Sequence, residues 1–494
     1  MRRTLLIFSR TQTPVLSGLM LLVMAIFLSS CAVTQPVEAD RDMGKDVVKQ
    51  VEDEMGIFND PGRTEYLNAI GQRLVRTLGD QRFVYSFQIV NQPESNAFAA
   101  PGGYIFVSRG LLALTSNEEE LANVIGHEII HVSQRHTAKQ LAKARAPSLL
   151  ALPGAIVGSV VSENVGNIIN APIMTLGSAY MAKHSRSDEF EADSLGQRLA
   201  ARSGYDPVAL ATVLSSLEQE AELVTGQKRR PGFFDTHPTA PDRVRQIQTD
   251  AQKIQWTQQP GITRNAAEYL KRLDGLLVGE DPAKGVFQGR KFLQPLLDFK
   301  IEFPQGWMAK NTSQAVVAFT EKQDALVFLS IAAKGTEPAK TAELLEQAMY
   351  NKHRIRPEQS EPTKIGKMPA HLIIYTDKSG REPMHLFFLL ITHHQLIYQF
   401  AGIAPERYRS TIRKTALSFR PLTSQERASI RETHLRVVAA QSKESLAQLS
   451  KRTGNVWDEK TTAVVNGING NQSLVKGQLI KIGVSRPYKS TASR

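Results

Sequence analysis

The residues best suited to chemistry lie in the HEIIH motif at 127–131. Side chains four residues apart share one face of a helix, so His127 and His131 can point two imidazole nitrogens at one zinc ion while Glu128 stands beside them as a base. A catalytic zinc needs three protein ligands and an open position for water. The third ligand must therefore come from elsewhere in the chain.

An acidic cluster at 189–193 can supply that ligand. Glu189 and Asp193 are also four residues apart, so one carboxylate can bind the metal while the other orients a histidine from the outer shell. The alternative is a surface helix whose histidines are simply solvated. The acidic cluster makes this alternative the weaker one.

The residues around the motif predict the helix that positions it. Ser116 and Glu119 fit a capping box, and the acidic run at 118–120 suits the positive end of the helix dipole. An apolar stripe follows, made of Leu121, Val124, Ile125 and Val132. Because burying two histidines and a glutamate is costly unless something pairs them, a zinc ion would stabilise this helix.

These residues resemble metallopeptidase family 48 of the gluzincins, which includes HtpX, the CAAX prenyl endopeptidases and the BepA-type proteases. The family pattern of HExxH followed by ExxxD matches the two clusters without a departure at any ligand position. The similarity extends to Asn96-Ala97-Phe98 and 101–107 before the helix. It also covers Thr236-His237-Pro238 and Arg243 after the acidic cluster.

The resemblance implies a metalloendopeptidase with one zinc ion per chain. The ion would be held by His127, His131 and Glu189, with Asp193 keeping a ligand histidine in the right tautomer. Glu128 would take the proton of the attacking water and hand it to the leaving amine. The family also implies that the strand region Ala97–Ser108 accepts peptide substrate by backbone pairing.

Several residues near the motifs keep more than one interpretation. His237 could close over the zinc as a switch, serve as a transition-state donor, or only fix its loop. Arg243 could stabilise the oxyanion or tie down the same loop. His136 and His184 are expected to be structural.

The N-terminus predicts secretion and a lipid anchor. Residues 1–30 combine a basic start with an apolar run too short to span a membrane, as in a signal peptide. Leu28-Ser29-Ser30-Cys31 resembles a bacterial lipobox, and Cys31 is the only cysteine, which also excludes disulfides. Ala32 would by resemblance direct the lipoprotein to the outer membrane, facing the periplasm.

Composition narrows the class of protein further. The chain has 494 residues, 41% hydrophobic and 22% charged, which describes a globular protein of two to four domains rather than a polytopic membrane protein. The formal charge is +12, and three leader arginines account for part of it. This basic balance favours solubility over binding to an anionic polymer, and no aromatic and basic platform for nucleic acid is present.

The fold class that we predict is multidomain. After the signal peptide, residues 31–278 form a mainly α-helical α+β protease domain of the zincin (gluzincin) type with a small antiparallel sheet. Residues 285–421 alternate strands and helices as an α+β sandwich that resembles PsbP/Mog1-like modules. Residues 430–484 resemble a βααβ LysM peptidoglycan-binding module, and 485–494 form a tail.

Within these domains, three local predictions bear on function. Gly232–Pro241 is expected to be a loop, because prolines lie within it and at its end. Ser148–Tyr180 is too interrupted to cross a bilayer and is ranked as packed core or lid above lipid contact. His393-His394 is expected to be a surface or turn pair without a metal-like partner.

We therefore predict a periplasmic zinc endopeptidase that is anchored to the outer membrane and acts in quality control of misfolded or misassembled envelope proteins. The resemblance of the C-terminal module implies peptidoglycan as a further partner, and no nucleic-acid partner is expected. One rival is an envelope-assembly chaperone or cell-wall-binding lipoprotein whose metal site is latched. A second rival is a zinc amidase that acts on cell-wall peptide.

Overall fold

The structure is a computed structural model that describes residues 37–80, 82–145, 183–223, 232–238, 242–263, 265–378 and 382–489. The predicted signal peptide, the predicted lipobox with Cys31, the segment Ser148–Tyr180 and the last residues of the tail lie outside these ranges. Within them, no helix combines the length and the hydropathy that a membrane crossing requires.

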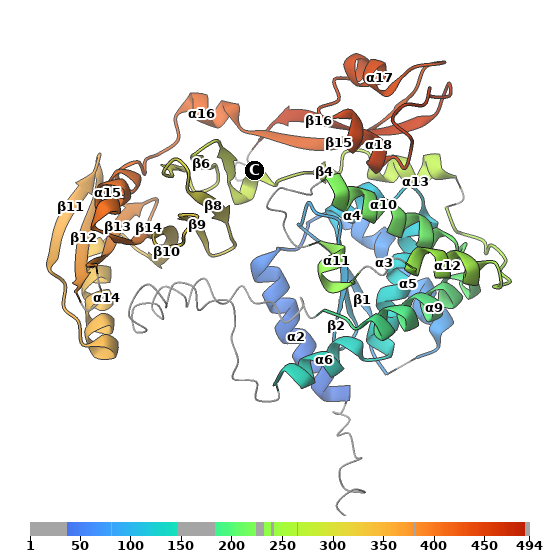
Figure 1. Ribbon diagram of the computed structural model, residues 1–494, viewed down its shortest axis with the longest axis horizontal. Coiled ribbons are helices and arrows are strands. Elements are labelled where there is room, and N and C mark those ends of the chain that lie inside the picture. The colour runs from blue at the N-terminus through green and yellow to red at the C-terminus, as the bar shows by residue number, and fades with distance from the viewer. Residues whose placement is uncertain are drawn as a thin grey trace, which may run out of the picture.

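The N-terminal part is a helical domain built on a three-stranded sheet (Figure 1). Helices α2 (Val37–Glu54) and α3 (Pro61–Leu78) precede strands β1 (Ser86–Val90), β2 (Ala97–Ala100) and β3 (Tyr104–Ser108). The predicted antiparallel sheet is wrong in one respect, because β1 and β3 are parallel and only β2–β3 is antiparallel. After β1 the chain crosses to the far edge as β2 and returns through Gly102 and Gly103, whose φ angles of 85° and 107° suit only glycine.

The remaining helices of this domain surround the sheet and one another (Figure 1). Within the described residues they are α4 (Arg109–Leu114), α5 (Glu118–Ser133), α6 (His136–Arg145), α9 (Arg186–Arg202), α10 (Ala209–Leu223), α11 (Phe233–Thr236), α12 (Arg243–Ala251) and α13 (Ala266–Leu273). The predicted loop at 232–241 therefore contains one short helix, because Asp235 accepts a hydrogen bond from Gly232 N and closes a turn there.

Helix α5 begins one residue later than predicted. Asn117, rather than Ser116, is the N-cap, and its side chain accepts a hydrogen bond of 2.8 Å from the backbone N–H of Glu120. The carboxylate of Glu120 accepts in turn from Ser116 N at 2.7 Å. The hydroxyl of Ser116 has another neighbour, since it lies 3.3 Å from Nζ of Lys481.

Helices α5 and α9 cross in close contact at two glycines. A Cβ atom on Gly196 would lie 3.0 Å from His127 N, and one on Gly126 would lie 3.3 Å from Gly196 O. Larger residues would force these backbones apart. The close crossing sets the HEIIH motif of α5 directly against the acidic cluster of α9.

The middle part is an antiparallel seven-stranded sheet in the order β11-β12-β13-β14-β10-β9-β8. Its strands are β8 (Met308–Asn311), β9 (Ala315–Phe319), β10 (Leu326–Lys334), β11 (Gln359–Ile365), β12 (Met368–Asp377), β13 (Met384–His393) and β14 (Leu396–Pro405). Alternate residues of β13 belong to two separate apolar clusters, so both faces of the sheet are covered. Helix α14 (Pro338–His353) packs on one face and α15 (Arg409–Leu417) on the other, together with a small sheet, which fits the predicted α+β sandwich. That small sheet contains β5 (Val286–Gln288), β6 (Lys291–Gln294) and β7 (Phe299–Glu302).

The C-terminal part has the predicted strand–helix–helix–strand order. It contains β15 (Arg431–Ala439), α17 (Leu446–Thr453), α18 (Glu459–Val465) and β16 (Leu479–Pro487), linked to the middle part by α16 (Ser424–Ser429). It packs directly on the helical domain, since β15 pairs with β4 (Leu277–Val278) and Leu435 lies in the core of that domain.

Lys481 on β16 ties this C-terminal part to the start of α5. Its Nζ donates hydrogen bonds of 2.8–2.9 Å to the carbonyls of Ala113, Leu114 and Thr115, where α4 ends. Burial lowers the pKa of Lys481 to about 7, and Glu120 acts in the opposite direction. A buried amine with three carbonyl partners is satisfied only while the C-terminal part stays docked.

Replacing Lys481 tests this contact. Lys481→Met should lower the free energy of unfolding by about 3 kcal/mol, because three buried carbonyls and Glu120 lose their partner. Urea unfolding measures the loss. Lys476→Met, an exposed lysine of the same part, is the matched control, and equal midpoints for the two variants would contradict the role of Lys481.

Candidate metal centre

Four side chains converge where α5 crosses α9. Nε2 of His131 lies 2.9 Å from Nε2 of His127 and 3.4 Å from a carboxylate oxygen of Glu189. Nδ1 of His237 lies 3.3 Å from His127 Nε2 and 3.1 Å from Glu189. All four side chains are buried, and one donor atom of each lies within 4.8 Å of the others.

This cluster fits a metal ion on chemical grounds. The two Nε2 atoms face each other, while the outer nitrogens already face other partners, namely Asp193 at 3.0 Å and His136 at 3.0 Å. Two histidines and a carboxylate are a donor set that zinc prefers. A cation between these donors would satisfy lone pairs that otherwise meet in a dry interior.

Glu128 points into the same space without a hydrogen bond to either carboxylate oxygen. It is completely buried, and Nε2 of His237 is 3.4 Å away. Burial raises the pKa of Glu128, whereas the nearby His237 and His127 act to lower it. A buried carboxylate that contacts His237 but accepts no hydrogen bond is suited to exchange a proton with a molecule that enters the site.

Glu189 is held as an anion despite its burial. Burial alone favours the neutral acid, but His237 and the hydrogen bonds from His131 and His237 keep the pKa of Glu189 well below its usual value. Nη1 of Arg243 adds an ion pair of 2.9 Å. The carboxylate is therefore ready to act as a ligand.

Asp193 and Arg243 form a second layer behind His127. Asp193 lies 3.0 Å from Nδ1 of His127, and Arg243 donates two hydrogen bonds of 2.8 and 2.9 Å to Asp193. Burial opposes the ionised form of Asp193, yet these two partners lower its pKa. Arg243 also donates to the carbonyl of Pro238, so its contacts favour tying down the loop over stabilising an oxyanion.

His237 lies inside the centre rather than at its edge. It caps the short helix α11, and its ring stacks on Phe233 at 4.3 Å between centroids. Burial alone lowers the pKa of His237, but the carboxylates of Glu189 and Glu128 outweigh that effect and raise it. The structure thus places His237 beside the candidate ligand atoms. The spacing of residues in the sequence could not predict this position.

Two histidines expected to be structural also contact the centre. His136 meets the outer nitrogen of His131, and His184 stacks on the His131 ring at 3.9 Å between centroids. Burial lowers the pKa of His184 to about 3, so this ring is neutral. The spacing of His136, five residues after His131, offers no helical signal, because the contact depends on a turn between α5 and α6.

The pair His393-His394 was expected to lack a metal-like partner, and the structure places an acidic residue beside it. It lies in the β13–β14 turn as predicted, but Asp298 is beside it, with its carboxylate 3.2 Å from Nε2 of His394. Asp298 lies in the turn between β6 and β7, 96 residues before His394 in the sequence. Asp298 already pairs with Arg427, so we assign the cluster no function.

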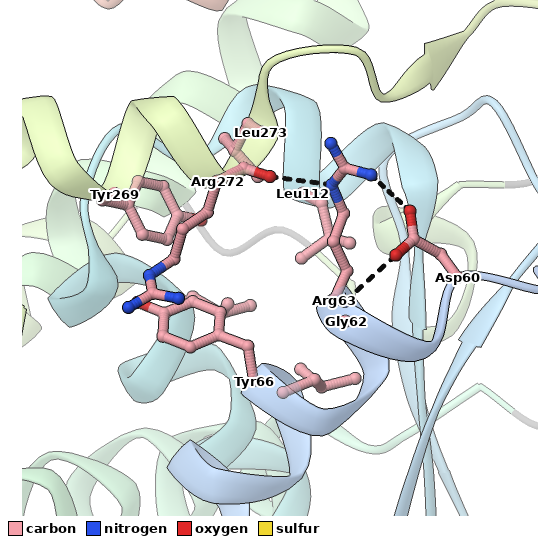
Figure 2. A pocket seen from close by; sticks show the side chains of 10 residues that line it. Asp60, Gly62, Arg63, Tyr66, Leu112, Tyr269, Arg272 and Leu273 are labelled. Atoms are coloured by element: carbon pink, nitrogen blue, oxygen red, sulfur yellow. Dashed lines mark hydrogen bonds and ion pairs between the residues drawn. The ribbon is translucent and has the colours of Figure 1, made fainter.

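A separate cavity of about 300 Å³ lies between α3 and α13 (Figure 2). In its wall the guanidinium of Arg272 lies 4.5 Å from the ring centroid of Tyr66. Arg63 is held by Asp60 and by the backbone of Arg272. None of the candidate metal or catalytic residues lines this cavity.

A helix with HExxH crossed by a helix with ExxxD defines the class of the zinc metallopeptidases. Residues 61–251 match the description "Peptidase family M48". It is 30% identical over 245 residues to the beta-barrel assembly-enhancing protease of Escherichia coli K12, covering 49% of each chain. It is 27% identical over 236 residues to the mitochondrial metalloendopeptidase OMA1 of Schizosaccharomyces pombe, covering 47% of this chain and 65% of that one.

The chain spans about half the length of the assembly-enhancing proteases that it matches. Among solved structures, cyanobacterial PsbP from Synechocystis is a neighbour at 12% identity and a TM-score of 0.24, covering 29% of this chain and 98% of that one. The yeast Ran-binding protein Mog1p matches at 9% identity and a TM-score of 0.21, covering 28% and 98%.

The ligand set can be tested by zinc content. Glu189→Ala should weaken zinc binding at least about 100-fold, because it removes an anionic donor, and this exceeds the loss typical of outer-shell changes. Glu128→Gln should keep one zinc per chain. Elemental analysis after dialysis against a weak chelator distinguishes the two, and full zinc occupancy in Glu189→Ala would contradict this ligand set.

Proposed function

We propose that this protein is a zinc-dependent endopeptidase with His127, His131 and Glu189 as metal ligands and Glu128 as general base. The observation that carries the proposal is the buried carboxylate of Glu128, which accepts no hydrogen bond and lies beside a cluster of metal donors. The M48 domain supports the same chemistry.

Zinc bound at these ligands would supply Lewis-acid activation of the scissile carbonyl and of the attacking water. Glu128 would take the proton of that water on its carboxylate and pass it to the leaving amine. Asp193, fixed by Arg243, would hold His127 in the tautomer that keeps Nε2 free. Burial of the site would exclude bulk water and strengthen each of these interactions.

His237 would act as a latch in this mechanism. It lies against Glu189 and against Glu128 in the described conformation, so it fills space that a substrate and water need. A catalytic zinc requires an open position. His237 would therefore withdraw from the site when a substrate enters.

The sequence and the relatives support our proposal for the location and the substrates. The lipobox at Cys31 supports an anchor in the outer membrane facing the periplasm. The relatives named as beta-barrel assembly-enhancing proteases support misassembled envelope proteins as substrates. The βααβ order of the C-terminal part supports a LysM-like module that contacts peptidoglycan.

Catalysis by Glu128 has a direct test. Wild type should cleave casein or a misfolded envelope protein, whereas Glu128→Gln should lose at least about a thousandfold in rate, because it keeps the metal but lacks the base. Equal protection of a client from aggregation by both proteins, without cleavage, would instead support a chaperone. Release of stem peptides from purified sacculi would support the amidase.

The latch makes a separate prediction. His237→Ala should raise the cleavage rate about threefold or more, because the fraction of open sites grows. Peptide cleavage by wild type and variant at equal zinc occupancy measures it. A loss of rate comparable to that of Glu128→Gln would show that His237 is a transition-state donor rather than a latch.

A further inference from the structure

His131 has a histidine, not a carboxylate, behind it. Its Nδ1 lies 3.0 Å from Nδ1 of His136, and Nε2 of His136 lies 3.2 Å from a carboxylate oxygen of Glu191. The side chain of His136 is 1% exposed, while that of Glu191 is 47% exposed. A chain of hydrogen bonds therefore runs from the metal centre through a buried ring to a carboxylate at the surface.

A metal at Nε2 of His131 would fix the positions of the protons along this chain. If His131 offers Nε2 to a metal, its proton is on Nδ1 and is donated to His136 Nδ1. His136 must then carry its own proton on Nε2, where Glu191 accepts it. In this arrangement each donor has an acceptor, so the chain is compatible with the tautomer of His131 that a metal requires.

The backbone is shaped to make this contact. Arg135, between α5 and α6, has φ of 60°, an uncommon conformation for a non-glycine residue. Its guanidinium donates hydrogen bonds of 2.7 and 2.8 Å to the buried carboxylate of Asp40 on α2. The turn at Arg135 folds the chain back, so that the first residue of α6 meets the last histidine of the motif on α5.

We propose that His136 and Glu191 are positioning residues that fix the tautomer and orientation of His131 and thereby set the affinity of the site for zinc. The proposal rests on the proposed metal centre and adds a second outer layer to it. The layer behind His127 is a buried carboxylate and arginine, whereas the layer behind His131 ends in an accessible carboxylate.

Zinc affinity of the full chain, measured by competition with a chromophoric chelator and without substrate, tests this proposal. His136→Leu should weaken zinc binding about 10- to 100-fold, because Nδ1 of His131 loses its acceptor. His136→Asn should remain within about threefold of wild type, because its side-chain oxygen can take the place of Nδ1. Glu191→Gln should lie between them, and Glu459→Gln, an exposed glutamate far along the chain, is the matched control.

Several outcomes would overturn the proposal. The first is that His136→Leu, shown to be folded by circular dichroism, binds zinc as tightly as wild type. The second is that His136→Leu and His136→Asn lose zinc affinity equally, which would mean that packing of the His136 ring, and not its hydrogen bond, sets the affinity. If wild type itself bound no zinc, the proposed function would be wrong. The zinc affinity of wild type therefore separates a failure of the proposed function from a failure of this inference.

Discussion

The close crossing of α5 and α9 at Gly126 and Gly196 is the constraint on which the site depends. Neither helix holds a complete set of ligands, and each would bury charged or polar groups at a cost if it stood alone. The missing Cβ atoms let the two backbones approach until a carbonyl of one helix lies over the motif of the other. The distances among His127, His131 and Glu189 follow from that approach.

Buried charges from distant segments then hold the crossing in place. Arg243 of α12 pairs with Glu189 and Asp193, Arg135 pairs with Asp40 of α2, and Lys481 of the C-terminal part bonds to the end of α4. Each of these cations is satisfied only if its own segment is docked. The geometry of the candidate metal centre therefore depends on the docking of these segments, including a C-terminal part whose sequence resembles a separate module.

Much of the fold was predictable because helical period and turn residues are local. The motif helix, the four-residue spacing of Glu189 and Asp193, and the strand–helix–helix–strand order of the C-terminal part follow from such patterns. The ring of His136 could not be placed, because its position depends on a positive φ at Arg135 and on a partner in α2. The pairing of Lys481 and the approach of Asp298 to His394 are likewise long-range contacts that no local pattern encodes. The parallel pairing of β1 and β3 was missed for the same reason, since strand order is a property of the folded chain.

Anomalous diffraction at the zinc absorption edge from crystals of the purified chain tests the central claim most directly. The account predicts one strong peak, coordinated by Nε2 of His127, Nε2 of His131 and the carboxylate of Glu189. A map without such a peak, or a peak whose zinc ion is coordinated by other side chains while Glu189 points away, would contradict the account.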